Sequence, residues 1–171
     1  MKANIIASGA SLKGFNLDSI EGYKLVLNHV YKYVDEYDGI VCFDSPKIVK
    51  IPQELEHKTH TLAEHNFGIG YEVGTPHGFE RREGWVVQIN ATLFMAINIA
   101  LLEGYKEIDV YGADMELTDG FVHFYDEKKA DPKLRAHYER RFKKNRKEWD
   151  MLSKSLLVDE KVAFVDVRNN P

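Results

Sequence analysis

Polar residues that could contact an anionic ligand come directly after three apolar segments of the chain. A turn rich in Gly and Ser that follows a buried strand can bind phosphate through hydroxyls and bare backbone N–H groups. An Asn amide can contact a ribose or a base edge. Residues that directly follow a strand lie at the edge where α/β sheets usually bind ligands. The residues concerned are Ser8, Gly9 and Ser11 after the first segment, Asn28 after the second, and Asp114 after the third.

Each of these residues also has a purely structural interpretation. The stretch 8–14 (SGASLKG) is not a Walker loop, because Lys13 precedes the second glycine, and it has no Gly-x-Gly-x-x-Gly motif. From this stretch alone we favour an ordinary tight turn. Asn28 is likewise a residue type that is common in turns.

The histidines are the second group that could do chemistry. His123 has the ordinary pKa of a general acid or base. Its neighbours in the run 121–126 (FVHFYD) are largely aromatic, so a packed structural histidine is an equal alternative. Four more occur in a less regular region, at His57, His60, His65 and His77. We interpret these four as solvated side chains rather than metal ligands, since no cysteine accompanies them, and we expect no metal site and no cofactor.

The apolar pattern predicts that alternating strands and helices position these residues. Strands are expected over 3–7, 23–27, 39–43, 107–111 and 161–167, with a short one over 59–62. This alternation predicts one α/β domain over residues 1–171, with three layers and a mostly parallel central sheet. A helix is expected from His29 toward Gly39, and the glycine-rich region 63–84 is expected to be a flexible loop.

The central element is a helix within 90–103 that has almost no polar face and should therefore be buried. Asn90 or Thr92 would cap its start by accepting a backbone N–H bond, and Gly104 would end it. We place the start of this helix at the same edge of the sheet as Asp114. Asn90 and Thr92 are therefore candidate ligand contacts.

A second long helix is expected from Pro132 toward Leu157, with an apolar stripe and a strongly basic face over 133–147. Such a face is usually solvated. It could also attract an anionic nucleotide, a glycan, a membrane surface or nucleic acid.

The composition is that of a soluble globular protein. A formal net charge of −4 argues against a protein that simply coats nucleic acid, and the single cysteine, Cys42, excludes an intramolecular disulfide. The sequence shows no signal segment and no apolar stretch of the roughly 20 residues that a membrane helix needs. We therefore expect a cytoplasmic protein without an integral membrane segment.

Four separated motifs follow one pattern. They are 5–15 (IIASGASLKGF), 27–33 (LNHVYKY), 96–108 (AINIALLEGYKEI) followed by Gly-x-Asp, and, more loosely, 136–138 (AHY). In the same order and over nearly the whole chain, they resemble motifs of the small bacterial CMP-sialic-acid-dependent sialyltransferases of the lipooligosaccharide type. They also resemble the Rossmann-like relatives of these enzymes, a group that includes archaeal pterin diphosphokinases.

The resemblance implies a Rossmann-like fold and a glycosyltransferase-like enzyme that binds a nucleotide or nucleotide sugar, with a glycan as acceptor. Ser8, Gly9 and Ser11 would contact phosphate, Asn28 the ribose or phosphate, and Asn90 and Thr92 the base. His137 or His123 would be the base that deprotonates the acceptor hydroxyl.

The chain departs from the family pattern at catalytic positions. Glu116 and His123 stand where the family has two tyrosines that assist the departing phosphate, and Arg141 stands at the register of the family's histidine base. A carboxylate repels a departing phosphate, and an arginine cannot act as a base near neutral pH. The alternative to an enzyme is therefore a non-catalytic nucleotide-binding protein of the same fold. A third possible function is association with nucleic acid through the basic helix. A homo-oligomer is possible.

Overall fold

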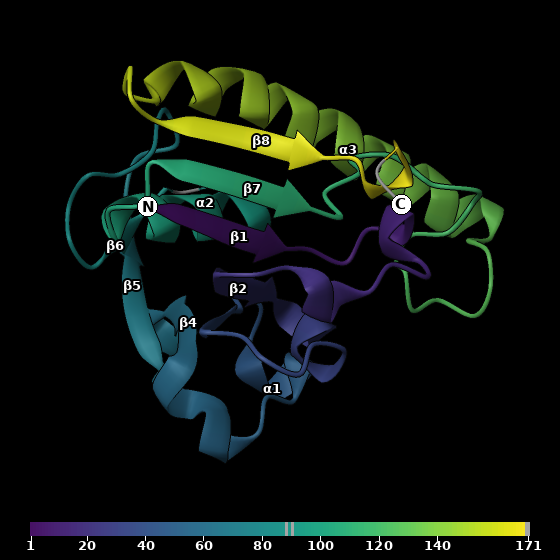
Figure 1. Cartoon of the computed structure of the whole chain (residues 1–171), viewed down its shortest axis with the longest axis horizontal. Coiled ribbons are helices and arrows are strands. Elements are labelled where there is room, and N and C mark those ends of the chain that lie inside the picture. Colours follow the sequence, from purple (N-terminus) through teal and green to yellow (C-terminus); the bar gives the residue numbers. More distant parts are fainter. Residues whose placement is uncertain (88, 90, 170–171) are drawn as a thin grey trace.

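The computed structural model describes residues 1–87, 89 and 91–169 and confirms the predicted α/β fold. One sheet of eight parallel strands has the order β6-β5-β4-β3-β2-β1-β7-β8 (Figure 1). The strands are β1 (Lys2–Ile6), β2 (Tyr23–Leu27), β3 (Gly39–Val41), β4 (Thr59–Leu62), β5 (Ile69–Val73), β6 (Trp85–Val86), β7 (Glu107–Tyr111) and β8 (Lys161–Val165). The α-helices are α1 (Pro46–Val49), α2 (Thr92–Leu102) and α3 (Pro132–Leu152).

The strand order reverses at β1, and this reversal sets the place of the candidate site. From β1 the chain builds β2 to β6 on one side and then returns to add β7 and β8 on the other. Ile6 pairs in register with Val26 of β2 and with Tyr111 of β7, so the three strands end together. Ligands of open α/β sheets bind beside such a reversal, outside the carboxyl ends of the strands.

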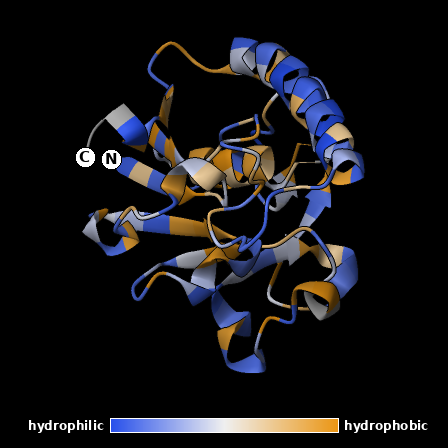
Figure 2. Ribbon diagram, turned by 90° about the vertical axis from the view of Figure 1, so that its right-hand side faces the viewer, coloured by the Kyte–Doolittle hydropathy of each residue, from blue (hydrophilic) through white to orange (hydrophobic). Residues whose placement is uncertain are grey.

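Helices and short turns cover the two faces of the sheet and give a Rossmann-like three-layer domain. On one face α2 is buried almost all round, and Phe94 stacks on Trp149 of α3 with ring centroids 6.2 Å apart. On the other face short 3₁₀ turns bury Leu12, Leu17 and Val30 against the strands. Seen from the carboxyl side, the outer surface of α3 is mostly hydrophilic, whereas the interior segments are hydrophobic (Figure 2).

A buried amide holds the chain that enters α2. Asn98 is fully buried in the middle of this otherwise apolar helix. Its Oδ1 accepts hydrogen bonds from the backbone N–H groups of Glu80 (2.8 Å) and Val87 (3.0 Å), and its Nδ2 donates to the carbonyl of Glu80 (3.0 Å). The amide thereby satisfies backbone groups of the segment 79–87 that the helix would otherwise leave unpaired.

Two expectations about local structure are wrong. The chain after β2 forms only a 3₁₀ helix over Asn28–Lys32, because the left-handed backbone of Asn28 (φ 49) turns it sharply at once. Region 63–84 is not one loop, since β5 runs through it. A side chain at position 70 would place its Cβ 2.9 Å from the Cα of Ala63, so Gly70 permits a close approach rather than a loop.

The remaining boundaries follow the apolar pattern closely. Residues 59–62 form a strand as expected, and α3 ends at Leu152, five residues before the expected end.

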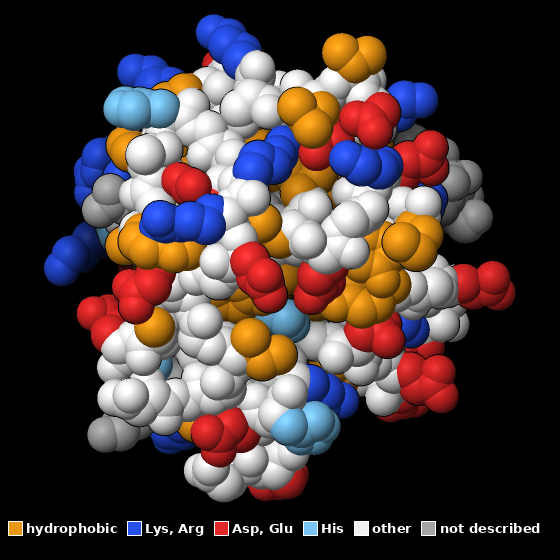
Figure 3. Space-filling view, turned by 90° about the vertical axis from the view of Figure 1, so that its left-hand side faces the viewer, with side chains coloured by type: hydrophobic (Ala, Val, Ile, Leu, Met, Phe, Trp, Pro, Cys, Tyr) orange, Lys and Arg blue, Asp and Glu red, His pale blue; other side chains and the backbone are white. Residues whose placement is uncertain are grey.

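Within the described ranges, no helix combines the length and the apolar character needed to cross a membrane. Figure 3 views the molecule from the side where the strands begin; acidic side chains lie around the middle of this face.

Candidate functional site

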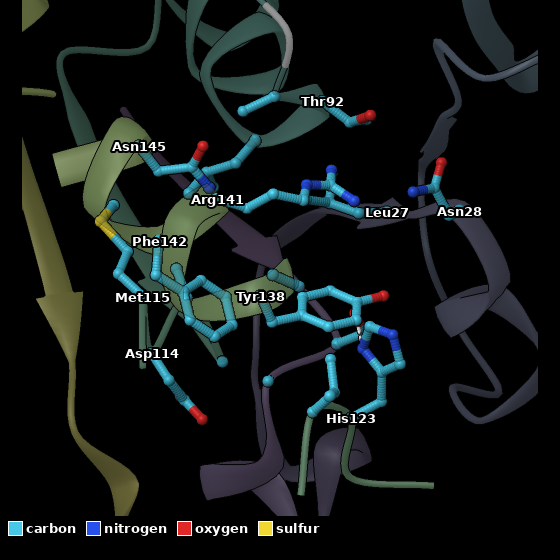
Figure 4. Close-up of a pocket in the computed structure, with 18 of the residues that line it drawn as sticks. Leu27, Asn28, Thr92, Asp114, Met115, His123, Tyr138, Arg141, Phe142 and Asn145 are labelled. Atoms are coloured by element: carbon cyan, nitrogen blue, oxygen red, sulfur yellow. Dashed lines mark hydrogen bonds between the residues drawn. The ribbon is translucent and has the colours of Figure 1, made fainter. Parts of the chain in front are cut away.

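A cavity of about 320 Å³ opens at the carboxyl edge of the sheet, where the strand order reverses. Groups that follow four strands line it: Ser8 and Gly9 after β1, Asn28 after β2, Asp44 after β3 and Asp114 after β7. Thr92 lines it from the start of α2, and α3 closes it with Tyr138, Arg141, Phe142 and Asn145 (Figure 4). The structure therefore brings the sequence-predicted residues of three strand ends and of α2 into one place.

The loop after β1 is held by the loop after β7. The Gly9 N–H donates to the carbonyl of Gly112 over 2.7 Å, and a Cβ at position 9 would lie 2.3 Å from that oxygen. Gly9 is therefore required by the close contact of the two loops. Its N–H group already has a partner inside the protein.

Asp114 and Ser11 bind each other. The Asp114 carboxylate accepts hydrogen bonds from the Ser11 N–H (2.8 Å), from the Ser11 hydroxyl and from the Thr118 hydroxyl (3.1 Å). Figure 4 shows the carboxylate pointing away from Arg141. Ser11 is buried and does not line the cavity, so Asp114 and Ser11 form an internal anchor for the edge of the site.

Asn28 supplies an acceptor that the protein does not use. Its positive φ turns the side chain over the end of β2, and its Oδ1 is buried without a hydrogen-bond partner in the described part of the chain. An unsatisfied buried acceptor costs about 1–3 kcal/mol. Figure 4 shows the Nδ2 of the same amide turned toward Arg141 and the cavity, so the nitrogen is the group that a ligand can contact.

Of the two expected caps of α2, Thr92 is not the cap residue. Ala91 is the N-cap residue and makes no side-chain cap bond, while Thr92 is the first helical residue and lines the cavity. Asn90, the other predicted cap and base contact, lies outside the described residues. The first turn of α2 holds no acidic residue, and the positive end of the helix dipole points to the cavity.

His123 is fixed at the bottom of the cavity beside Ser8. Its Nδ1 lies 3.0 Å from the Ser8 hydroxyl, and its ring stacks on Tyr125 with centroids 5.1 Å apart. Burial lowers the pKa of His123, and nearby Arg141 and His29 lower it further, against Asp126 and a Ser8 backbone bond that raise it. The imidazole is therefore neutral near pH 7 and able to accept a proton.

Arg141 lines the cavity, although the sequence analysis gave it no ligand contact and mentioned it only at the register of the family's histidine base. In Figure 4 its side chain extends across the cavity toward Leu27 and Asn28. Among the described lining residues it alone carries a permanent positive charge, and no carboxylate lies within ion-pair distance of it. The spacing of Tyr138, Arg141, Phe142 and Asn145 is the signal that could have found it, because i, i+3, i+4 and i+7 share one helix face.

Two candidate residues lie apart from the centre of this arrangement. His137 is exposed on α3 and is not part of the cavity lining, although it neighbours Tyr138 in sequence. Glu116 lies at the rim, where its carboxylate is 60% exposed and 3.9 Å from the Arg168 guanidinium. His123 rather than His137 is therefore the histidine that the structure brings to the strand ends.

The histidines of the irregular region do not converge. His60, expected to be solvated, is instead buried in β4, 3.1 Å from the Tyr71 hydroxyl, and burial lowers its pKa to about 4. No cluster of three or more His, Cys, Asp or Glu side chains suited to a metal occurs within the described ranges.

The chemistry that the cavity offers is anion binding by the Arg141 guanidinium and the start of α2, and proton transfer by the His123 imidazole.

Comparison of the chain with family models, with curated proteins and with solved structures finds no match.

Proposed function

We propose that the protein is a glycosyltransferase-like enzyme that binds a nucleotide or nucleotide sugar, such as a CMP-sugar, in the carboxyl-edge cavity. The observation that carries the proposal is the Arg141 guanidinium, which makes no ion pair within the described ranges and extends across a cavity bounded by strand ends and the start of α2. A guanidinium and a helix start attract the same ligand group, a phosphate. The cavity volume is at the lower end of the range for small-molecule sites.

Within this proposal the phosphate contacts lie on α3 and α2 more than on the first loop. The N–H groups of Gly9 and Ser11 already donate inside the protein, which leaves Arg141 and the first turn of α2 to contact the anion. Asn28 would donate a hydrogen bond to the ribose or the base through its Nδ2, which Figure 4 shows turned toward the cavity. Thr92 would contact the base from the other side of the cavity.

His123 would act as the base that deprotonates the acceptor hydroxyl. Its lowered pKa keeps the ring neutral near pH 7. Direct displacement of the nucleotide with inversion requires a base within hydrogen-bond reach of the attacking hydroxyl. The acceptor would be a glycan, and the reaction would take place in the cytoplasm.

A thermal-shift screen with CMP, CDP, UDP, CMP-sialic acid and UDP-glucose tests nucleotide binding. At a ligand concentration of about 100 Kd, binding to the native state adds about 2.7 kcal/mol to stability and raises the melting temperature. We expect a rise with at least one nucleotide and none with the free base or sugar. The absence of a rise with every compound would contradict the proposal.

Donor hydrolysis separates an enzyme from a protein that only binds nucleotides. We expect His123→Ala to reduce hydrolysis of the donor by a factor of about 10²–10⁴, and His137→Ala, which alters an exposed residue, to leave it unchanged. Nucleotide binding without any hydrolysis in the wild-type protein would favour the non-catalytic alternative.

The exposed basic face of α3 supports one different function, association with nucleic acid. Lys133, Arg135, Lys143 and Lys147 are all exposed and none makes an ion pair within the described ranges. This function would be favoured if no nucleotide raised the melting temperature and if single- or double-stranded nucleic acid bound with steep salt dependence.

A further inference from the structure

The pair Ser8 and His123 has the geometry of a nucleophile with its base. The hydroxyl that lies against His123 Nδ1 is that of Ser8, at 3.0 Å. Both residues line the cavity, so a bound ligand can reach them. In nucleophilic catalysis a serine hydroxyl becomes reactive when a neighbouring base within this distance takes its proton.

The pair is held together by backbone bonds between segments 115 residues apart. Gly9 and His123 form an antiparallel β-bridge, and the Phe124 N–H donates to the Ser8 carbonyl over 3.0 Å. The His123 N–H donates to the Asp126 carboxylate over 2.8 Å, which fixes the turn that carries the ring. The distance between the hydroxyl and the imidazole is thus set by the backbone and needs no movement on ligand binding.

The His123 ring is also fixed in orientation. Tyr125 stacks on it, and the Tyr138 ring meets it edge-on with centroids 5.9 Å apart. Arg141, on the same face of α3 as Tyr138, places a positive charge in the same cavity. A positive charge that lines the same cavity can stabilise the oxyanion that forms when a hydroxyl attacks a carbonyl carbon.

We propose that Ser8 and His123 form a nucleophile–base dyad that gives the cavity a hydrolase activity toward small carboxylic esters. The Ser8 oxygen attacks the carbonyl carbon while its proton passes to His123 Nδ1, and the oxyanion faces Arg141. The tetrahedral intermediate then expels the alcohol, which takes the proton from His123, and leaves an acyl group on Ser8. Water, deprotonated by His123, attacks this acyl group and releases the carboxylic acid, which restores the Ser8 hydroxyl.

This activity does not depend on nucleotide binding. It uses the same cavity as the proposed transferase, but it requires only the dyad and the positive charge. The two ideas can therefore fail separately.

The direct test is labelling of the full-length protein with a fluorophosphonate probe, followed by peptide mass spectrometry. Ser8 would attack phosphorus and displace fluoride, and its proton would leave through His123. We expect one adduct, located on Ser8, together with hydrolysis of p-nitrophenyl acetate. Ser8→Ala should abolish both, and His123→Gln should slow labelling at least about 100-fold.

Ser19→Ala is the matched control, because Ser19 is exposed and lies outside the cavity; it should label as the wild type does. If His123→Gln melts too early to compare, labelling of Ser8 relative to all other serines in the wild-type sample gives the answer. No adduct on Ser8 in folded wild-type protein, or an equal labelling rate in a folded His123→Gln variant, would overturn the dyad. Labelling of Ser8 without any nucleotide binding would support the dyad and contradict the transferase proposal.

Discussion

At the amino edge of the sheet, the Tyr23 hydroxyl donates a 2.7 Å hydrogen bond to Glu103, and the Lys24 N–H donates to Asp38 over 2.7 Å. At the carboxyl edge, by contrast, the Asn28 Oδ1 is buried without a partner and Arg141 has no carboxylate within ion-pair distance in the described part of the chain. Figures 3 and 4 show these two regions. Polar groups that satisfy one another stabilise the fold, whereas a charge that lines a cavity without an ion pair, as Arg141 does, is available to a ligand.

The comparison also separates two kinds of perturbed pKa. His60 and Tyr71 pack against each other beside the amino edge, and burial is the first cause of the lowered pKa of His60 and of the raised pKa of Tyr71, which is about 12. His123 is perturbed by burial as well, but unlike His60 it lines a cavity, which Arg141 also lines. A shifted pKa indicates a functional site only when the group can reach a ligand.

The largest predicted change in the free energy of unfolding comes from protonation of His60 as the pH falls. The unfolded chain binds a proton at this histidine below pH 6.5, whereas the folded state binds it only near pH 4. Stability should therefore fall as the pH decreases through this window, by about 3 kcal/mol from this residue. Urea unfolding of wild type and His60→Gln at pH 7 and pH 4 measures the difference, because the other groups contribute equally to both proteins. An identical loss in both would contradict the role given to burial.

A somewhat smaller effect is expected at the anchor of the carboxyl edge. Asp114→Asn replaces an acceptor oxygen with a donor against Ser11 and Thr118, and should lower the free energy of unfolding by about 2–3 kcal/mol. Asp119→Asn is the control, since Asp119 is exposed and asparagine tolerates its left-handed backbone (φ 53). Chemical denaturation at pH 7 measures both, and equal stabilities would show that Asp114 is free to serve a ligand instead.

The smallest effect is expected at the amino edge. Tyr23→Phe removes only the hydroxyl that bonds Glu103 and should cost about 1 kcal/mol of stability. Because Tyr23 lies at the opposite end of β2 from Asn28, nucleotide binding and Ser8 labelling should not change. A change in either would mean that the two edges are coupled.

Much of the fold could be predicted from local pattern. The spacing of apolar residues within each segment was enough to predict α2 and the strands β1, β2 and β7. The strand β5 was missed because its exposed residues and its glycines are typical of a loop. Gly70 lies in this strand because Ala63 packs so closely against it that a side chain would not fit.

The site could be predicted only in part. Ser8, Asn28 and Asp114 could be predicted as cavity-lining residues because each follows a strand and parallel strands bring their carboxyl ends together. The bond between Ser11 and Asp114 depends on a contact between distant segments, which no local pattern contains. The spacing on α3 groups Arg141 with Tyr138, but it does not show that this helix face meets the strand ends. The burial of His60 was missed for the same reason.

The most direct test of the central claim, that the carboxyl edge is a nucleotide site, is a calorimetric titration of CMP into wild type, Arg141→Met and Arg140→Met. Arg141→Met keeps the apolar stem and removes the charge from the cavity, whereas Arg140 is exposed and does not line it. We predict that CMP binds the wild type and Arg140→Met alike and binds Arg141→Met about 10- to 100-fold more weakly, which is about 1.4–2.8 kcal/mol. Equal affinity of all three proteins, or no binding of CMP or any other nucleotide by the wild type, would contradict the account.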